Sequence, residues 1–296
     1  MIAKIRQRHD ALAPMTRGAI GFIVAVLMFN LMDVGAKTLV ADYPSPQVVW
    51  ARYAAQTGLM VLIFLPSIRQ RLRTAHLGLQ LVRSLFLFSA TVVFFTSFFY
   101  LELATAAAVF ATSPLIITIL SAAVLKEQVG PRRWVAVLIG LTGVLIILRP
   151  GFDVFQMAAL LPALAACFYA SYQIATRWLG ASEPIWTTLL YTTGVGTVLA
   201  TLALPFFWVA PTGTDALIMV SMGAFGLAGH VCLVYALNQA PASALAPFNY
   251  MGFVWASIVG FIFFAELPDA VTIAGASVII SAGIYVWHRE RVRARE

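Results

Sequence analysis

The sequence predicts an all-α integral membrane protein whose ten transmembrane helices form two inverted five-helix repeats. Three observations lead to this fold class. The chain of 296 residues is 61% hydrophobic and only 10% charged, whereas a typical globular chain is about one-quarter charged. Apolar runs of about 20 residues recur along the chain, and each is long enough to cross the hydrocarbon layer as a helix. Finally, one stretch of the first half is repeated in the second half.

The repeated stretch has the pattern of a helical hairpin. Residues 104–151 and the segment that starts at Ala240 both begin with small residues and continue as an apolar run that ends at a glutamate, Glu127 or Glu266. A short proline-bearing turn then leads into a second apolar run. The copies align at a shift of about 136 to 139 residues. Because each repeat has an odd number of helices, the two repeats insert with opposite orientation, as is typical of secondary transporters.

The individual spans follow from the apolar runs and from the residues that interrupt them. A basic, polar arm precedes the first span, and Pro44 and Pro46 break the chain after it. A loop with three arginines follows the second span, a basic turn follows the fourth, and the fifth ends before Arg149-Pro150-Gly151, a sequence that stops a helix. The expected spans are 18–39, 47–65, 79–101, 105–125, a fifth that ends before residue 149, 154–179, 184–207, 215–237, 242–265 and 270–287.

The chain accordingly divides into four segments. Residues 1–17 form a cytoplasmic N-terminal arm, 18–151 the first five-helix repeat, 152–288 the second, inverted repeat, and 289–296 a basic cytoplasmic tail.

The distribution of lysine and arginine predicts the orientation, because these residues accumulate in cytoplasmic loops. The opposite side has Arg149, with Lys37 and Arg52 near it. The turn after Glu127 is basic, whereas the matching turn after Glu266 contains an acid and no base. We therefore expect a multi-pass protein of the bacterial inner (cell) membrane with both termini in the cytoplasm. The residues that fall on the cytoplasmic side are Lys4, Arg6, Arg8, Arg17, Arg69, Arg71, Arg73, Lys126, Arg132, Arg133, Arg177, Arg289, Arg291, Arg293 and Arg295.

Several classes of function are disfavoured by the same sequence. The net charge of +7 lies in loops and termini, as expected for a membrane protein, and does not indicate nucleic-acid binding. No nucleotide-binding loop is present, so ATP-driven transport would need a separate subunit, and no ATPase subunit is implied by the sequence. No cleavable signal peptide is visible. Cys167 and Cys232 lie within apolar runs and are expected to be packing residues, so no metal and no cofactor is predicted.

The chain resembles the drug/metabolite transporter superfamily, specifically its ten-helix EamA-type branch, over almost its whole length. Among members it is most similar to the YddG-like amino-acid exporters. The resemblance implies a bundle around a central cavity lined mainly by the first, third, fourth, sixth, eighth and ninth spans, with the fifth and tenth at the periphery. The motifs that carry it are the duplicated hairpin, Ser113-Pro114 followed by Lys126-Glu127, Arg149-Pro150-Gly151, and Tyr250 through Glu266 followed by Leu267-Pro268-Asp269.

Ionisable residues within spans are costly to bury and are therefore candidates for a substrate site. In the first span, Asn30, Asp33 and Lys37 share one helix face. Asp33 and Lys37 are spaced as an acid–base pair, and a structural ion pair is the alternative to a binding role. His230 in the eighth span is a further candidate, and an inter-helix hydrogen bond is the alternative.

Polar and aromatic groups in other spans complete the candidate substrate-binding set. Tyr169 and Gln173 share a face of the sixth span, and Ser113 precedes a proline in the fourth. The ninth span contributes the last three candidates, and for all these aromatic residues the alternative is that they fill gaps between helices. The full set is Asn30, Asp33, Ser113, Tyr169, Gln173, His230, Asn249, Tyr250 and Trp255.

Other polar and aromatic residues are expected to be structural. Trp50 and Tyr100 are assigned to the interfacial aromatic belts, and Arg83 is expected to anchor the third span at the inner surface. Glu127 and Glu266 lie at helix ends, where a role in the turn is expected.

The resemblance implies a secondary transporter that exports small metabolites, amino acids above all, including aromatic and apolar ones. Uptake or exchange of a nucleotide-like metabolite or a vitamin, and drug export, are the alternatives within transport. A membrane-embedded enzyme is the distant alternative, because the intramembrane acids are too few and too dispersed for it. The expected partners are the small-molecule substrate and membrane lipid, and we expect a monomer or a weak dimer.

Overall fold

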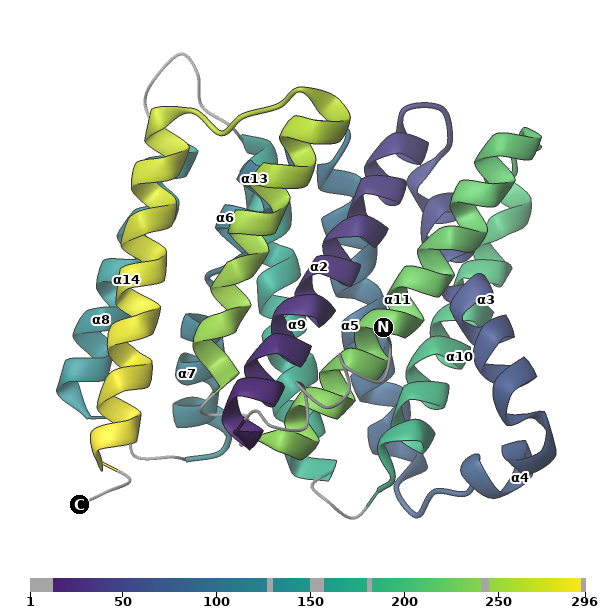
Figure 1. Ribbon diagram of the computed structural model, residues 1–296, viewed down its shortest axis with the longest axis horizontal. Coiled ribbons are helices and arrows are strands. Elements are labelled where there is room, and N and C mark those ends of the chain that lie inside the picture. The colour runs from purple at the N-terminus through teal and green to yellow at the C-terminus, as the bar shows by residue number, and fades with distance from the viewer. Residues whose placement is uncertain (1–12, 127–129, 150–156, 180–182, 241–244, 294–296) are drawn as a thin grey trace.

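The computed structural model describes residues 13–126, 130–149, 157–179, 183–240 and 245–293 (Figure 1). All of the regular structure in these ranges is helical. In chain order, with η marking a 3-10 helix, the elements are α2 (Pro14–Val40), α3 (Ser45–Phe64), η1 (Leu65–Ser67), α4 (Ile68–Arg71), α5 (Leu77–Ser97), α6 (Leu103–Phe110), α7 (Ser113–Val124), α8 (Pro131–Leu148), η2 (Met157–Ala159), α9 (Leu160–Leu179), α10 (Ile185–Ala203), η4 (Leu204–Phe206), α11 (Gly213–Gln239), η5 (Ala246–Tyr250), α13 (Met251–Phe264) and α14 (Ala270–Arg293).

The length and composition of these helices are those of a multi-pass membrane protein. Within the described ranges, seven helical segments are long and apolar enough to cross a membrane, and three shorter apolar helices accompany them. The long segments are Pro14–Val40, Ser45–Arg71, Leu77–Ser97, Leu103–Val124, Met157–Leu179, Ile185–Phe206 and Gly213–Gln239, and the shorter ones are Trp134–Leu148, Phe248–Phe264 and Ala270–Tyr285.

The fourth and ninth apolar runs are interrupted, although the sequence analysis predicted each as one continuous helix. The fourth is split into α6 and α7, because Pro114 in the first turn of α7 has no N–H to donate to the preceding turn. In the ninth, Leu245 is α-helical, the 3-10 helix η5 follows, and the α-helix resumes at Met251. Where the chain leaves α7 and α13, Lys126 and Ala265 have left-handed φ angles of 56° and 55°. A helix interruption and a left-handed residue after the helix thus occur at matching places in both halves.

The two ends of the helical region extend further than predicted. Helix α2 begins at Pro14, so the last residues of the predicted arm are helical, with proline at the start of a helix where its missing N–H costs nothing. Helix α14 continues to Arg293, into the predicted tail. Residues 1–12, 127–129, 150–156 and 241–244 lie outside the described residues, and with them the structural role predicted for Glu127.

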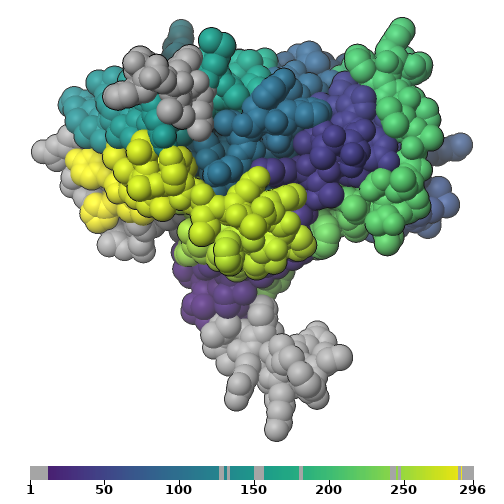
Figure 2. Space-filling model, turned by 90° about the horizontal axis from the view of Figure 1, so that it is seen from above, coloured from purple at the N-terminus to yellow at the C-terminus, as the bar shows by residue number. Residues whose placement is uncertain are grey.

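The helices pack in pairs that join segments far apart in the chain. Helix α2 packs along α11, and α5 packs along α9. Helices α3 and α10 pack together towards one side of the bundle, and α8 and α14 form a pair at the opposite side (Figure 1). Seen from above, the yellow α14 lies beside teal residues at one edge, with the green residues near α10 and α11 at the other (Figure 2).

Helices α8 and α14 approach each other so closely that only glycine fits at their contact. A Cβ built on Gly143 would lie 2.7 Å from the carbonyl oxygen of Gly275, and a Cβ on Gly275 would lie 2.7 Å from the carbonyl oxygen of Gly143. In lipid, such close backbone packing replaces the hydrophobic effect as the force that holds helices together.

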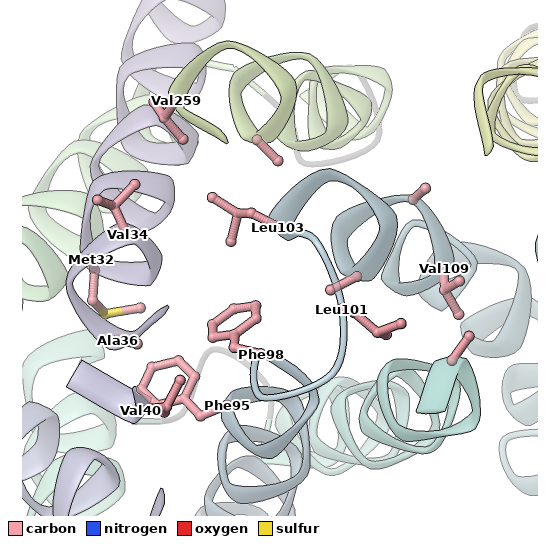
Figure 3. Packing of buried hydrophobic residues seen from close by; sticks show 14 of the residues in the cluster. Met32, Val34, Ala36, Val40, Phe95, Phe98, Leu101, Leu103, Val109 and Val259 are labelled. Atoms are coloured by element: carbon pink, nitrogen blue, oxygen red, sulfur yellow. The ribbon is translucent and has the colours of Figure 1, made fainter. Parts of the chain in front are cut away.

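Large apolar side chains lie on the outside of the bundle as well as in its core. Phe206 is 82% exposed and Leu62 is 71% exposed, which fits a surface that contacts lipid rather than water. The main apolar core lies between α2, α5, α6 and α13, where Phe95, Phe98 and Leu103 meet residues of α2 (Figure 3). We call this group the apolar plug, and it lies towards the C-terminal end of α2.

Candidate functional site

The interior of the bundle contains polar and charged side chains in the middle of apolar helices. Arg52 of α3 is 8% exposed, Arg83 of α5 is 1% exposed, and Gln56 and Gln80 are fully buried. Because a charge is costly to bury at membrane depth, each arginine needs either partners or a function.

Arg83 is held by five neutral acceptors from three helices. Its Nη1 donates to Gln80 Oε1 at 3.1 Å and, on α10, to the Thr188 carbonyl and the Thr192 hydroxyl, both at 3.0 Å. Its Nη2 donates to the Tyr172 hydroxyl at 2.9 Å, and Nε donates to a threonine of α9 at 3.2 Å. The prediction that Arg83 anchors the third span at the inner surface is therefore wrong, because the side chain turns into the junction of α5, α9 and α10.

Arg52 lies at the junction of α3 and α5 with far fewer partners. Its Nη1 donates to the Thr91 hydroxyl at 2.5 Å, while its Nε is buried and has no hydrogen-bond partner in the described part of the chain. The guanidinium carbon lies 4.9 Å from the ring centre of Tyr53 and 5.6 Å from that of Phe95. These rings fix the guanidinium by cation–π attraction without using its remaining N–H groups.

Asp33 on α2 faces Arg52 electrostatically but does not bind it. The charge of Arg52 acts on the Asp33 carboxylate, yet no ion pair or hydrogen bond of that carboxylate occurs among the described residues. The side chain is partly exposed although it lies between the buried Asn30 and the mostly buried Lys37 on one helix face. Asp33 is therefore a partly exposed acid without a described partner in the middle of α2.

The predicted pairing of Asp33 with Lys37 is wrong. The Lys37 ammonium binds the Glu266 carboxylate at 2.5 Å and 2.7 Å and the Leu101 carbonyl at 3.0 Å. Glu266 also accepts from the Leu103 backbone N–H at 3.3 Å. We call these four residues the outer closure, since they join the C-terminal ends of α2 and α13 to the turn between α5 and α6. Glu266 thus binds across the bundle in addition to its place in a turn.

The groups around the outer closure are also charged. Burial, followed by the charge of Glu266, raises the pKa of Glu102. A cavity of about 480 Å³ lies beside the closure and is bordered by Lys37, Thr38, Asp42, Phe98 and Phe264 among others. A smaller apolar cavity of about 170 Å³ lies between α3, α5 and α10.

A second ion pair joins the two halves at the same end. Arg149, with a left-handed φ of 52°, ends α8 and binds Asp269. Asp269 also accepts from the Thr272 N–H at 2.8 Å and so caps the start of α14. The hydrogen bond from Arg149 is the main cause that lowers the Asp269 pKa to about 2.

His230 links α11 to α3. An inter-helix hydrogen bond of this kind was the predicted alternative to a substrate-binding role. The His230 Nδ1 lies 2.7 Å from the Gly226 carbonyl and 3.2 Å from Gln56 Nε2. The two contacts require opposite roles of Nδ1, so the tautomer that donates to Gly226 favours a flipped Gln56 amide. The ring packs edge-on against Phe29 of α2. Asn30, one position along, donates to its own helix at the Val26 carbonyl.

Tyr169 and Gln173 lie together, as their spacing predicted. Gln173 Nε2 donates to the Tyr169 hydroxyl at 3.1 Å, and the Tyr169 ring contacts those of Phe110 and Tyr172. Since Tyr172 binds Arg83, this pair belongs to the Arg83 junction. Ser113 is buried at the break between α6 and α7.

The three candidates of the ninth span do not form a cluster. The Tyr250 ring packs over Gly283 of α14, and its buried hydroxyl has no partner in the described part of the chain. Trp255 is partly exposed, and its Nε1 is likewise buried without a described partner. Asn249 is exposed. Tyr250 thus faces the peripheral helix α14.

Sequence reasoning missed the interior roles of Arg52, Gln56, Arg83 and Tyr172. Arg52 was expected near the side opposite the cytoplasm and Arg83 at the inner surface, and no role was assigned to Gln56 or Tyr172. Arg52 and Gln56 nevertheless share a face of α3, as do Gln80 and Arg83 on α5. Paired polar residues on one face of an apolar helix were the available signal. Trp50 packs on Trp208, and Tyr100 is 68% exposed. Their assignment to the aromatic belts stays a prediction.

Comparison with known proteins decides the family. A model described as the EamA-like transporter family matches residues 16–149 and again residues 156–287. The chain belongs to the EamA-like transporter family. A riboflavin transporter of Vibrio cholerae serotype O1 is 30% identical to this EamA-like transporter over 94% of its chain and 95% of the relative. An S-adenosylmethionine uptake transporter of Rickettsia felis is 25% identical over 96% of each chain.

Two further matches extend the comparison. A pseudopaline exporter of Pseudomonas aeruginosa is 27% identical to this EamA-like transporter over 90% of the chain and 94% of the relative. One solved crystal structure is similar to this protein over 95% of this chain and 99% of its own chain, with a TM-score of 0.65 and 19% sequence identity. This match shows likeness of fold alone. The family and these named relatives are small-metabolite transporters, in uptake and in export. The finer placement among YddG-like amino-acid exporters stays a prediction.

Proposed function

We propose that this EamA-like transporter is a secondary transporter that moves small metabolites by alternating access and exports amino acids, including aromatic and apolar ones. The observation that carries the proposal is the polar interior. Charged and aromatic groups from helices of both halves meet inside a bundle whose outer surface is apolar. A mostly uncharged wall with a few polar groups can cover an apolar side chain and orient its polar end.

The proposed architecture is two inverted repeats of five spans, 18–151 and 152–288. The double match of the family model supports it. So do the helix breaks before Ser113 and Met251 and the left-handed exits at Lys126 and Ala265, since each pair is separated by 138 or 139 residues. Helix pairing supports it further. If each helix is replaced by its counterpart in the other half, the α2–α11 contact becomes the α9–α5 contact, and the α3–α11 contact becomes the α10–α5 contact.

In this proposal the outer closure is the contact that alternates. It joins α2 of the first half to the end of α13 in the second and adjoins the apolar plug, with which it shares Leu103. Breaking the Lys37–Glu266 pair and separating the plug opens the interior to the outside, while the closed form favours access from the cytoplasm. A substrate that enters from the cytoplasm and leaves when the closure opens is exported.

The proposed substrate site is the interior space bordered by Asp33, with Asn30, Ser113, Tyr169, Gln173, His230 and Trp255 as further candidates. Tyr250 and Asn249 are the weakest members of the predicted set, because Tyr250 packs on α14 and Asn249 is exposed. Neither of them shares a described contact with Asp33 or Arg52.

Amino acids are proposed over the other substrate classes on the charges of this interior. It contains one acid and one arginine with unmet hydrogen bonds, rather than the cluster of cations that desolvating a doubly charged phosphate requires. Among the compounds in the names of the relatives, S-adenosylmethionine has an α-amino-acid head group and riboflavin has none. The relatives therefore define a useful pair of test substrates.

The deciding experiment is counterflow in liposomes that contain the purified protein. Labelled phenylalanine, methionine and threonine are compared with S-adenosylmethionine and riboflavin. Exchange of amino acids supports the proposal. Exchange of riboflavin alone overturns the substrate class and leaves a transporter of a different metabolite.

The proposed orientation places both termini in the cytoplasm of a bacterial cell, with the membrane crossed ten times. Reporter fusions at Arg71 and Pro211 are expected to report opposite sides of the inner membrane. The same side for both fusions contradicts the proposed topology.

A further inference from the structure

Among the described residues, two arginines are buried in this bundle, and one of them is short of partners. Arg83 has five acceptors around it, whereas the only hydrogen bond of the Arg52 side chain among the described residues is the one to Thr91. The Thr91 hydroxyl is itself fully used, because it also bonds to the Tyr53 hydroxyl at 3.0 Å and to the Leu87 carbonyl at 2.9 Å. Thr91 therefore positions Arg52 without satisfying it.

The remaining N–H groups of Arg52 are held in a fixed place. The rings of Tyr53 and Phe95 lie against the guanidinium, and Phe95 belongs to the apolar plug with Met32 and Ala36 of α2. Asp33 is next to Met32 in the chain. The unmet donors of Arg52 and the carboxylate of Asp33 thus adjoin the same apolar plug, and no direct contact joins them among the described residues.

A buried donor without an acceptor is costly, and a mobile arginine side chain would be expected to reach a nearby carboxylate. Here Thr91 and two rings hold the arginine back. The separated charges are complementary to a molecule that has both charges itself, and an amino-acid zwitterion adds no net charge to the membrane interior when it binds.

We infer that Arg52 and Asp33 form a subsite for the head group of a zwitterionic α-amino acid, with the guanidinium binding the carboxylate and the Asp33 carboxylate binding the ammonium group. This inference rests on the proposed transport function and assigns its substrate class to named residues. The side chain of the amino acid then points away from α3, towards the aromatic wall of α6 and α9. Access is from the side of Asp33, because Asp33 is partly exposed and Arg52 is buried.

The test compares three ligands that differ only in the head group. L-phenylalanine has both charges, L-phenylalaninamide lacks the carboxylate, and 3-phenylpropionate lacks the amine. Each competes with labelled phenylalanine for counterflow by the wild type and by the Arg52→Gln, Arg52→Lys and Asp33→Asn variants. If another amino acid of the panel is the better substrate, its amide and deaminated analogue replace these.

The expected result is a change in discrimination between ligands. Arg52→Gln weakens the apparent affinity for phenylalanine by about tenfold or more, the range for losing a hydrogen bond to a charged group. It changes the apparent affinity for phenylalaninamide by less than about threefold. Asp33→Asn removes the preference for phenylalanine over 3-phenylpropionate, and Arg52→Lys keeps part of the preference for a carboxylate. The matched control is Arg69→Gln, which removes an exposed arginine from the loop after α3 and leaves every ratio unchanged.

The ratios separate this inference from the proposed function. A wild type that exchanges amino acids, with variants that lose all three ligands equally, overturns the head-group subsite alone and makes Arg52 a structural residue. A wild type that exchanges no amino acid overturns the proposed substrate class and the subsite together. Because the ratio is measured within one variant, a lower yield of folded protein does not affect it, and thermal unfolding of each variant measures any structural loss separately.

Discussion

Arg52 and Arg83 are both buried in the same bundle and differ in almost everything around them. Arg83 is surrounded by acceptors from α5, α9 and α10, with a ring of α9 at 4.8 Å from its guanidinium carbon. Arg52 has one hydrogen bond, an Nε without a described partner and an acid that it does not reach. Protein acceptors offset the cost of burying the charge of Arg83, whereas those around Arg52 offset only part of it.

The difference shows how one residue type serves two purposes. A guanidinium whose donors are all used by its own helices holds those helices together and has nothing left to offer a ligand. A guanidinium held in place by rings and one hydroxyl is preorganised for an anion that comes and goes. The following experiments test whether this distinction between a saturated and an unsaturated arginine holds.

The largest effect is expected from Arg83→Ala. This change leaves the Gln80 side-chain oxygen and the Tyr172 hydroxyl without their donor at the junction of three helices, and each buried acceptor left unsatisfied costs about 1 to 3 kcal/mol. We expect a much lower melting temperature and yield, read by thermal unfolding in detergent. A stable Arg83→Ala protein that has lost transport contradicts the comparison, because Arg83 would then be the functional arginine.

The outer closure provides the next test, because its charges are paired with each other across the two halves. Lys37→Met leaves Glu266 without its cation and is expected to favour the open form by about 1 to 3 kcal/mol, a shift of about 5- to 150-fold in population. The measurement is thiol labelling of Ala106→Cys, buried one turn below Leu103, in a protein without Cys167 and Cys232.

The matched control for Lys37→Met is the double variant Lys37→Met with Glu266→Gln. It breaks the same contact without leaving the partly buried Glu266 carboxylate unpaired, so its loss of folded stability is expected to be smaller. Equal labelling of Ala106→Cys in wild type and in both variants indicates that the pair does not restrict opening.

A smaller effect is expected from Tyr250→Phe. The Tyr250 hydroxyl is buried without a described partner, so its removal is expected to stabilise the protein by up to about 1 kcal/mol. If transport is unchanged, the unmet hydroxyl is a packing feature beside Gly283. Reduced transport with raised stability instead makes Tyr250 a substrate ligand, and it then belongs with Arg52 among the unsatisfied groups that await one.

The smallest effect is expected at the Arg149–Asp269 pair, where the acid is half exposed. The folded pKa of Asp269, about 2, lies below its usual value of 3.8, so its contribution to stability is present above about pH 4 and is lost as the pH falls towards 2. Asp269→Ala also removes the cap of α14, which costs about 0.5 to 2 kcal/mol. We expect its melting temperature to be lower at neutral pH and nearly equal to wild type at pH 2. An unchanged difference at both pH values contradicts the pairing.

The helices were predictable from the sequence, and the partners of the charged residues were not. Apolar runs gave most of the described helices to within a few residues, but the break between α6 and α7 at Pro114 was not predicted. Lys37 was assigned to Asp33 because spacing along one helix is visible in a sequence. Its true partner Glu266 is 229 positions away, and only the packing of α2 near α13 brings it close.

Arg83 was misplaced for a related reason. A position a few residues from a helix end suggests an arginine that reaches the membrane surface. The side chain turns inwards because α9 and α10 present threonine hydroxyls, a carbonyl and Tyr172 to it. The candidate site was predictable to the extent that its members share one helix, as Tyr169 and Gln173 do, and not where it depends on contacts between α2, α3 and α5.

The contact between α2 and α11 also affects how the chain is made. Gly18 and Gly35 let α11 approach α2 closely, with Cβ atoms at these positions coming within 3.2 Å and 2.7 Å of Ala236 and Met222 atoms. Helix α11 is completed 199 residues after α2, which takes about 10 to 40 seconds at ordinary rates of synthesis. During that interval the first helix has to remain in the bilayer with its glycine-lined face against lipid. Nascent α2 thus waits longest for its partner helix. An insertion chaperone has most to protect during this interval.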